Sequence, residues 1–311
     1  VLTEMQDDID PEEVLGNVTY IPWLDQPIVS VKITAPLQSK LISKTTSIQV
    51  DANAIWGISK VDFYIDDVLK HTDSNAPYEW SWNTTQYTEA SHRVEVKAFD
   101  TWGNGRSDNL TVTIDNTLPT GNVMSPAQGI HISRTYDIVL FGDDTNFDKM
   151  ELYIDQLQVA TWTTKGEHTF NWNTTRDSDG NHALWLFVYD KAENKLPVSI
   201  IVTVDNTPPA ITIQNPSENV VVAADLLIAV SLNDLSDITK VEFYVNDVLT
   251  STDMNAPYEW TWNTREYDNG EYTIKVKAYD ILGNDAGKTI KITVNNPKTP
   301  WWQTIDFLAL I

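Results

Sequence analysis

Aspartate and asparagine residues gather where the chain passes from one repeated block to the next. Asp115 and Asn116 stand at the first joint, and Asp205 and Asn206 stand ninety residues later at the second. If each block is a sandwich of strands, two loops of the following block face back toward its predecessor. The side chains expected to meet there are Asp143, Asp144, Asp190 and Asn194 at the first joint and Asn233, Asp234, Asp280 and Asn284 at the second.

Clusters of carboxylate and amide oxygens suit calcium, which takes six to eight oxygen ligands. The arrangement resembles the joints of cadherins, although it lacks their full ligand motif. The simpler interpretation is that these Asp and Asn residues form turns by bonding their own backbone, and we favour it at this point because such turns are common. Calcium is the one cofactor that the pattern suggests, and none is required.

The other residue types form no catalytic motif. His92 and His182 occupy the position held by Tyr272, where packing at the rim of an inward face is expected; the other histidines are His71, His131 and His168. There is no Gly-rich phosphate loop, His-Glu-x-x-His pair or Gly-x-Ser-x-Gly elbow. The absence of cysteine removes thiol catalysis and Cys-based zinc sites. We therefore expect that the protein is not an enzyme.

The composition is that of a folded, strongly acidic protein. Of 311 residues, 41% are hydrophobic, and the formal charge is −23. Such a charge repels phosphate backbones and anionic membrane surfaces, so no nucleic-acid partner is expected. No apolar run approaches the ~20 residues of a membrane span. The C-terminal tail, residues 297–311, becomes apolar, and we interpret it as the start of a membrane anchor that would continue beyond Ile311.

A repeat of ninety residues organises the chain. Asn255–Thr264 reproduces Asn75–Thr84 with one substitution, and the tripeptide Trp-Asn-Thr begins at Trp82, Trp172 and Trp262. A fixed period of this kind indicates copies of one domain. Within each copy, short segments with period-two alternation predict about seven strands. At the hairpin turns Asp66-Asp67, Asp155-Gln156 and Asn246-Asp247, Asn and Asp tolerate a left-handed backbone.

This pattern predicts an all-β chain of three tandem antiparallel β-sandwiches. Short Pro-stiffened joints such as 205–209 act as semi-rigid spacers, so an elongated rod is expected. The predicted division is an extended N-terminal arm over 1–27, domains over 28–118, 119–208 and 209–296, and the tail over 297–311.

The quoted residues resemble the Ig-like domains found in tandem on bacterial and archaeal surface proteins. The match rests on 240–245, 255–264, 269–280, Gly283-Asn284 and the Val-Asp-Asn-Thr-Pro-Pro joint at 204–209. It implies the fold over about 28–296, and a setting in spacers, adhesive stalks, S-layers or accessories of hydrolases. The chain departs from the pattern in two ways: the usual Asp-Gly turn lacks its Gly, and the second copy lacks the Pro-Tyr before its aromatic strand.

Aromatic residues suggest two surfaces. Tyr78, Trp80 and Trp82 alternate along one strand and would make a sugar-stacking platform if exposed, but their recurrence in every copy favours core packing. In the second copy, Trp185, Phe187 and Ile201 take outward positions that are polar in the other copies. They predict an exposed apolar patch, covered either by a partner molecule or by another part of this chain.

Asn-x-Ser/Thr sequons place candidate N-glycosylation sites at Asn17, Asn83, Asn109 and Asn173.

Two functions fit these observations. The first is a non-catalytic extracellular or cell-surface protein: a stalk, adhesin, or filament or S-layer subunit. It would assemble through its Ig-like domains and terminal arm, by self-association or with another surface protein. The second is an accessory, glycan-binding region of a secreted hydrolase.

Overall fold

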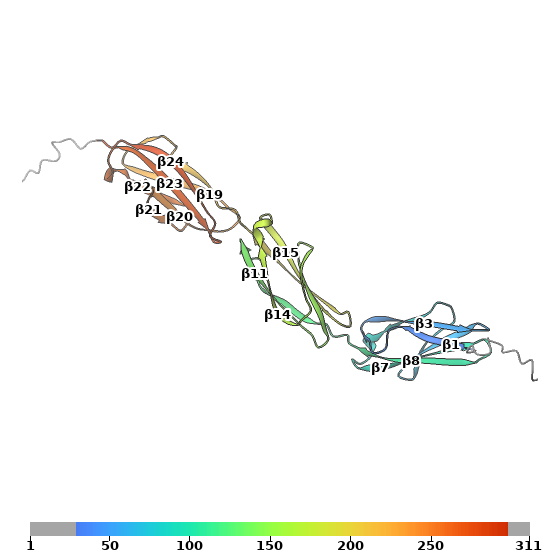
Figure 1. The fold of residues 1–311 in the computed structure, drawn as a ribbon. Coiled ribbons are helices and arrows are strands. Elements are labelled where there is room, and N and C mark those ends of the chain that lie inside the picture. Colours follow the sequence, from blue (N-terminus) through green and yellow to red (C-terminus); the bar gives the residue numbers. More distant parts are fainter. Residues whose placement is uncertain (1–28, 298–311) are drawn as a thin grey trace, which may run out of the picture. The chain divides into compact units, whose positions relative to one another are not determined.

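The computed structural model describes residues 29–297, and the predicted arm (1–27), Asn17 and all but the first residue of the predicted tail lie outside this range. The described chain is all-β and forms three sandwiches in tandem, each pairing a three-stranded sheet with a five-stranded sheet (Figure 1). Each sandwich adds one short 3-10 turn.

In sandwich 1 the three-stranded sheet has the order β1 (Val29–Ala35), β3 (Thr45–Ala54), β6 (Tyr78–Asn83). The five-stranded sheet has the order β2 (Leu41–Ile42), β8 (Gly105–Ile114), β7 (Ser91–Asp100), β4 (Ile58–Ile65), β5 (Val68–Asp73), and η1 spans Thr84–Gln86. In sandwich 2 the three-stranded sheet has the order β14 (Gly166–Asn173), β11 (Thr135–Asp143), β9 (Thr120–Ser125). The five-stranded sheet has the order β10 (His131–Ile132), β16 (Lys195–Val204), β15 (Gly180–Asp190), β12 (Phe147–Ile154), β13 (Leu157–Trp162), and η2 spans Thr174–Arg176. In sandwich 3 the three-stranded sheet has the order β17 (Ala210–Asn215), β19 (Asp225–Asn233), β22 (Glu259–Asn263). The five-stranded sheet has the order β18 (Val221–Val222), β24 (Asp285–Val294), β23 (Gly270–Asp280), β20 (Ile238–Val245), β21 (Val248–Asp253), and η3 spans Thr264–Glu266.

The core of each sandwich follows from alternation along its strands. In β7, Val94, Val96 and Ala98 are fully buried and the residues between them are partly exposed. On the opposing sheet Trp82 is buried, while Trp80 is half-buried and stacks on His71. Burial of each large apolar side chain stabilises a domain by roughly 1.5–3 kcal/mol. The aromatic strand therefore packs the core, as predicted, and offers no open sugar-stacking platform.

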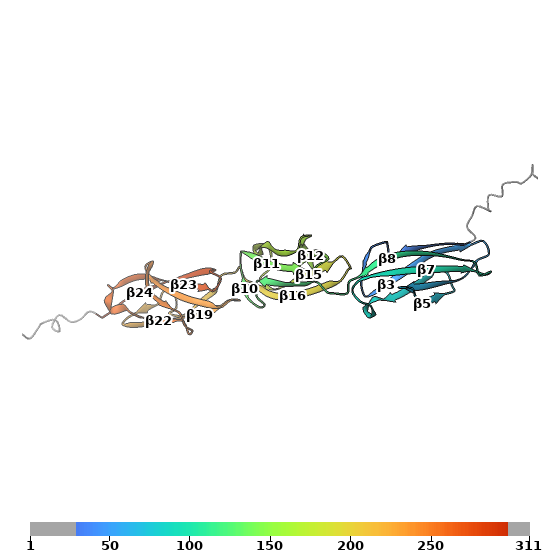
Figure 2. The same cartoon turned by 90° about the horizontal axis from the view of Figure 1, so that it is seen from below.

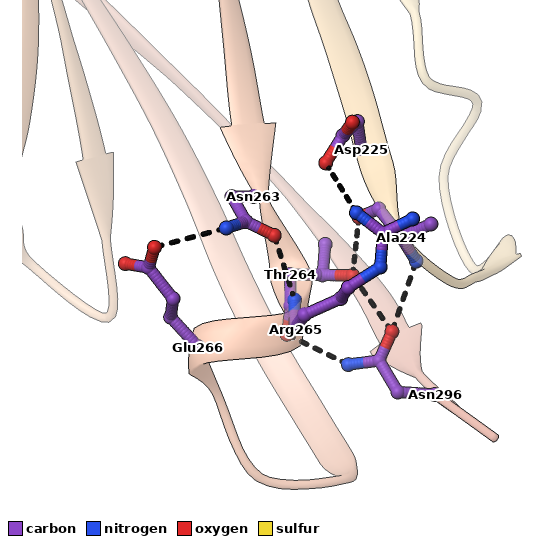
Figure 3. A network of polar contacts seen from close by, with 7 residues as sticks. All are labelled: Ala224, Asp225, Asn263, Thr264, Arg265, Glu266 and Asn296. Carbon is purple, nitrogen blue, oxygen red and sulfur yellow. Dashed lines mark hydrogen bonds and ion pairs between the residues drawn. The ribbon is translucent and has the colours of Figure 1, made fainter. Parts of the chain in front are cut away.

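The Trp-Asn-Thr repeat has a local explanation in sandwich 3, where Figure 3 shows the contacts of Asn263 and Thr264. Trp262 is buried in the core, and the Asn263 side chain caps η3 by accepting a hydrogen bond from the Arg265 amide. Thr264 is fully buried, and its hydroxyl donates to the carbonyl of Ala224 and to Asn296 Oδ1, at 2.5 and 3.0 Å. The tripeptide thus joins the core, the turn and the chain segment that leaves the sandwich.

The hairpin turns are as predicted, because both central residues have positive φ at Asp66-Asp67, Asp155-Gln156 and Asn246-Asp247. One pairing differs from the antiparallel expectation. The chain crosses between sheets after the first strand of each sandwich and lays a two-residue strand parallel to the last one, as in β2 beside β8. The longer strands pair antiparallel; β23 and β24, for example, lie side by side in both views (Figures 1 and 2).

By their contacts the described residues form two compact units. The first holds the residues up to Pro119 together with Asp144–Asp148 and Tyr189–Lys195, and the second holds the remainder. Two loop segments of sandwich 2 thus belong with sandwich 1. Among residues 29–297, no helix is long and apolar enough to cross a bilayer.

Candidate cation sites at the domain joints

Three carboxylates meet at the first joint. Asp115 follows β8, Asp144 follows β11 and Asp190 ends β15, and one oxygen of each lies within 4.8 Å of the others. Asp115 and Asp190 are buried and Asp144 is half-buried. The loops of sandwich 2 that carry Asp144 and Asp190 are the ones predicted to face back toward the joint.

Asn194 holds the first cluster together. Its backbone amide donates to Asp190 Oδ1 at 2.8 Å, and its side-chain amide donates to Asp190 Oδ2 at 2.7 Å and to the Asp115 carbonyl at 2.8 Å. Asn194 is fully buried, and its Oδ1 accepts no hydrogen bond from the described residues. The Asn194 side chain, which is bonded through its nitrogen to one of the three carboxylates, therefore has a buried oxygen that lacks a donor among the described residues.

The second joint repeats this arrangement. Asp205, Asp234 and Asp280 each place an oxygen within 4.8 Å of the others. Asn284 donates its side-chain amide to Asp280 Oδ2 at 2.7 Å and to the Asp205 carbonyl at 3.1 Å. Asp205 is fully buried, yet Oδ2 of Asp205 and Oδ2 of Asp234 accept no hydrogen bond from the described residues. Buried, unpartnered carboxylate oxygens are costly, because they lose water without gaining a donor.

The electrostatics of both clusters favour an added cation. Burial, and then the negative charge of Asp115, raise the pKa of Asp190. Burial, and then the charges of Asp205 and Asp280, raise the pKa of Asp234. Like charges held together in a poorly solvated site disfavour ionisation. A cation between the carboxylates would reverse this effect, because it binds the ionised form.

Some predicted ligands have other partners. Oδ1 of Asn116 accepts from the Lys44 amide at 2.7 Å and the Thr84 hydroxyl at 3.1 Å, and Oδ1 of Asn206 accepts the equivalent pair of bonds. Asn296 does the same in sandwich 3 (Figure 3). Asp143 pairs with Lys165 at 2.8 Å and is not among the three clustered carboxylates. Asn116, Asn206 and Asp143 are therefore removed from the candidate ligand set.

Sandwich 1 has the same turn without the cluster. Asp100 accepts from Asn104 through both its backbone and its side-chain amide, at 2.8 and 2.9 Å. However, Ala54 stands where sandwiches 2 and 3 have Asp144 and Asp234. Burial acts to raise the pKa of Asp100, but the hydrogen bonds from Asn104, Trp102 and Gly103 outweigh it and leave the pKa below its ordinary value.

Two groups of residues near these turns escaped the sequence analysis. Asn146 donates to Asp115 Oδ2 at 2.6 Å and so helps to fix the first cluster.

Trp56 and Trp102 form an exposed edge-to-face pair on sandwich 1, with ring centroids 6.3 Å apart. Laying the three copies in register would have revealed the tryptophans, because neither recurs in the other copies.

The predicted apolar patch lies on the five-stranded sheet of sandwich 2. Trp185 and Phe187 stack with ring centroids 5.9 Å apart, and Phe187 meets Tyr153 edge-on. Trp185 is 37% exposed and Ile201, on the neighbouring strand β16, is 46% exposed. The sheet thus presents apolar side chains where the equivalent positions of sandwich 3 carry Lys275 and Lys277.

The buried histidines take part in packing. His92 Nδ1 contacts Asp66 at 2.6 Å, and its ring meets Trp82 edge-on, as the ring of Tyr272 meets Trp262. His182 pairs with Asp155 in the same way. Burial acts to lower the pKa of His182, but its bonds to Ser178 and Asp155 prevail and raise it.

The described sequons are exposed. Asn83 and Asn173 cap η1 and η2 through their side-chain oxygens, and Asn109 lies on β8. Glycosylation at these positions stays a prediction.

Comparison with known proteins supports the fold. A family model described as bacterial Ig domain matches residues 30–96 and 209–276, in sandwiches 1 and 3. These two regions of the chain therefore match bacterial Ig domains, consistent with tandem Ig-like domains of that type. No curated protein sequence matches it.

Solved structures give likenesses of fold only. Fibronectin(III)-like modules of Clostridium thermocellum CbhA share 23% identity, with 57% of this chain and 95% of that chain covered, at a TM-score of 0.33. A three-Ig fragment of titin shares 12% identity over 87% and 99% of the two chains, at a TM-score of 0.39. Part of a bacterial ice-binding adhesin of 1.5 MDa shares 13% over 88% and 100%, at a TM-score of 0.35.

Proposed function

We propose that this chain is a non-catalytic structural part of an extracellular or cell-surface protein, in which divalent cations hold successive sandwiches together at two joints. The observation that supports the proposal is the recurrence, at both joints, of three clustered aspartates with a buried oxygen that lacks a donor. A stalk, an adhesin, or a filament or S-layer subunit would each use joints of this kind to set the stiffness of the chain.

The chemistry of the donors favours calcium. All candidate ligands are oxygens, from Asp115, Asp144, Asp190 and Asn194 at the first joint and from Asp205, Asp234 and Asp280 at the second. Hard oxygen donors suit calcium, and the chain offers no thiolate for softer metals. The ion would replace repulsion between carboxylates by attraction, and would bridge the end of one sandwich to loops of the next.

Thermal melting tests the proposal. Calcium at ten times its Kd adds about 1.4 kcal/mol to the stability of the joint that binds it, which raises the melting temperature of a domain of this size by roughly 5–10 °C. We expect this increase in millimolar calcium, its loss in chelator, and its loss in the double variant Asp144→Asn with Asp234→Asn. Asp143→Asn removes an acid next to Asp144 but outside the cluster, so this control should keep the response. A wild-type melting temperature indifferent to both calcium and chelator would refute the proposal.

The Trp185 surface, made by Trp185, Phe187 and Ile201, is proposed as the side of the module that meets another copy or another surface protein. Its support is the apolar exposure of Trp185 and Ile201 beside polar counterparts in the other sandwiches. Retention of the chain on a polysaccharide column would favour the accessory glycan-binding role instead.

A further inference from the structure

Sandwich 1 and two loops of sandwich 2, one after β11 and one after β15, meet through polar contacts. The Ser43 hydroxyl donates to the Ala192 carbonyl at 2.8 Å, and Lys40 Nζ pairs with Glu193 at 3.2 Å. Residues 40–44 form what we call the tail of sandwich 1. The head of sandwich 2 is formed by 144–146 and 190–194, so a tail meets a head.

The second joint brings together the equivalent segments through different residue pairs. His131 Nδ1 and the Ser236 hydroxyl lie 2.9 Å apart, and Arg134 donates to the Gly283 carbonyl at 3.2 Å. The tail of sandwich 2 is 130–134, and the head of sandwich 3 is 234–237 with 280–284. Both internal contacts thus join a polar tail to a head through polar contacts, although Leu235 and Ile281 on the head of sandwich 3 are also exposed.

The head of sandwich 1, 54–57 with 100–104, is different because it carries two tryptophans. Trp56 stands at the position of Ser236, and Trp102 stands at the position of Ala192. The two rings are 52% and 76% exposed, and Ile55 beside them is also exposed. The Thr101 hydroxyl donates to the Trp56 carbonyl at 3.1 Å and fixes the two loops together.

The tail of sandwich 3, 220–224, is apolar. Its sequence is Val-Val-Val-Ala-Ala, whereas the tails of sandwiches 1 and 2 carry Lys40, Ser43, His131 and Arg134. Val221 is 62% exposed, and Ala223 is also exposed. The backbone amide of Ala224 donates a hydrogen bond to Asn296 Oδ1, which fixes this end of the sandwich (Figure 3).

We propose that the chain associates with a second copy of itself, the tail of sandwich 3 on one copy docking on the head of sandwich 1 on the next. Repeating the second joint at this contact places Val221, in the position of His131, against Trp56, in the position of Ser236. Repeating the first joint places Ala223, in the position of Ser43, against Trp102, in the position of Ala192. Both polar pairs are replaced by apolar pairs, so the two ends complement each other as the internal partners do.

Such a contact joins different surfaces of identical chains. Heterologous contacts of this kind propagate into open filaments unless the rotation between copies closes a ring. The contact also lacks two of the three acids of each internal joint, and only Asp100 remains, at the position of Asp190 and Asp280. Asn295 replaces Asp115 and Asp205, and Ala54 replaces Asp144 and Asp234. Association between copies should therefore be indifferent to calcium, and its test is independent of the cation proposal.

Sedimentation velocity on the full chain tests the inference. All proteins carry Trp185→Lys, so that association through the Trp185 surface is not counted. In this background we expect species of one, two and more copies as the concentration rises to about 100 μM, where weak interfaces are populated. Trp102→Glu blocks the head and Val221→Lys blocks the tail, so each variant alone should be monomeric. An equimolar mixture of the two should form a two-copy complex and nothing larger, because one intact head meets one intact tail.

Val248→Lys is the matched control, since Val248 is an exposed valine of sandwich 3 on strand β21, outside the tail. It should associate like the parent, and chelator should change neither. A monomeric parent at the highest concentration would overturn the inference and indicate that the two ends are covered by other parts of the protein. Association of either blocked variant alone, or a mixture that stays monomeric, would equally contradict it.

Discussion

The turn that closes the head of a sandwich is built in the same way in all three, yet it lies in two different electrostatic settings. Asp100 and Asp190 each accept backbone and side-chain amide bonds from an asparagine four residues later. The pKa of Asp100 is lowered by these bonds, which outweigh burial, whereas the pKa of Asp190 is raised by burial and by Asp115. One local motif therefore serves either as a self-sufficient turn or as a part of a charged cluster, depending on what approaches it.

The largest expected effect separates the two settings by removing the asparagine. Asn284→Ala deletes the hydrogen bonds that the side-chain amide donates to Asp280 Oδ2 and to the Asp205 carbonyl. Because the site is buried, this should destabilise sandwich 3 by about 3 kcal/mol. Asn104→Ala deletes only side-chain bonding to Asp100, and should destabilise sandwich 1 less. Hydrogen exchange resolved to each sandwich, in chelator, measures both losses. Equal losses would mean that the joint adds nothing to the turn.

The next effect concerns locality. Calcium should protect residues 190–194 and 280–284 of the wild type from hydrogen exchange. Asp144→Asn should abolish this protection at 190–194 and leave it intact at 280–284, and Asp234→Asn should do the reverse. The protection lost is about 1.4 kcal/mol at ten times the Kd. The turn at 100–104 of sandwich 1 serves as the internal reference, because it should not respond to calcium in any variant. Loss of protection at both joints from a single substitution would contradict two independent sites.

The pH dependence of the two settings should have opposite signs. Asp190 and Asp234 have folded pKa values above the ordinary 3.8, so in chelator the stability they contribute is greatest at low pH and falls as pH rises through the window above 3.8. Asp100 has a lowered pKa, so its contribution is present above 3.8 and is lost as pH falls through its folded pKa. Protection factors corrected for intrinsic exchange between about pH 3 and 6 report both trends. Calcium should reverse the trend at the joints only.

The smallest effect on stability concerns the Trp185 surface. Trp185→Lys with Phe187→Lys installs the residue type that sandwich 3 carries at Lys275 and Lys277. The free energy of unfolding should therefore change by only about 0.5 kcal/mol. Lateral self-association or partner binding should be lost, as measured by sedimentation of the double variant against wild type. Unchanged assembly would remove this surface from the account.

The ninety-residue period was sufficient to predict the three sandwiches, their hairpin turns and the buried aromatic strand, because these depend on local alternation and on repetition. It also placed Asp115, Asp144 and Asp190 together, since topology fixes which loops face a joint. It did not reveal that the side-chain oxygens of Asn116 and Asn206 accept hydrogen bonds from within their own sandwiches, from the backbone amides of Lys44 and Arg134. Side-chain networks of this kind depend on three-dimensional partners such as Thr84, which spacing does not reveal.

Isothermal titration of the whole chain with calcium measures directly whether the two joints bind cations. We expect two bound ions per chain in the wild type, one in Asp144→Asn, one in Asp234→Asn and none in the double variant, with Asp143→Asn behaving as wild type. Absence of binding by the wild-type chain, or binding that survives in the double variant, would contradict the assignment of the two joints as cation sites.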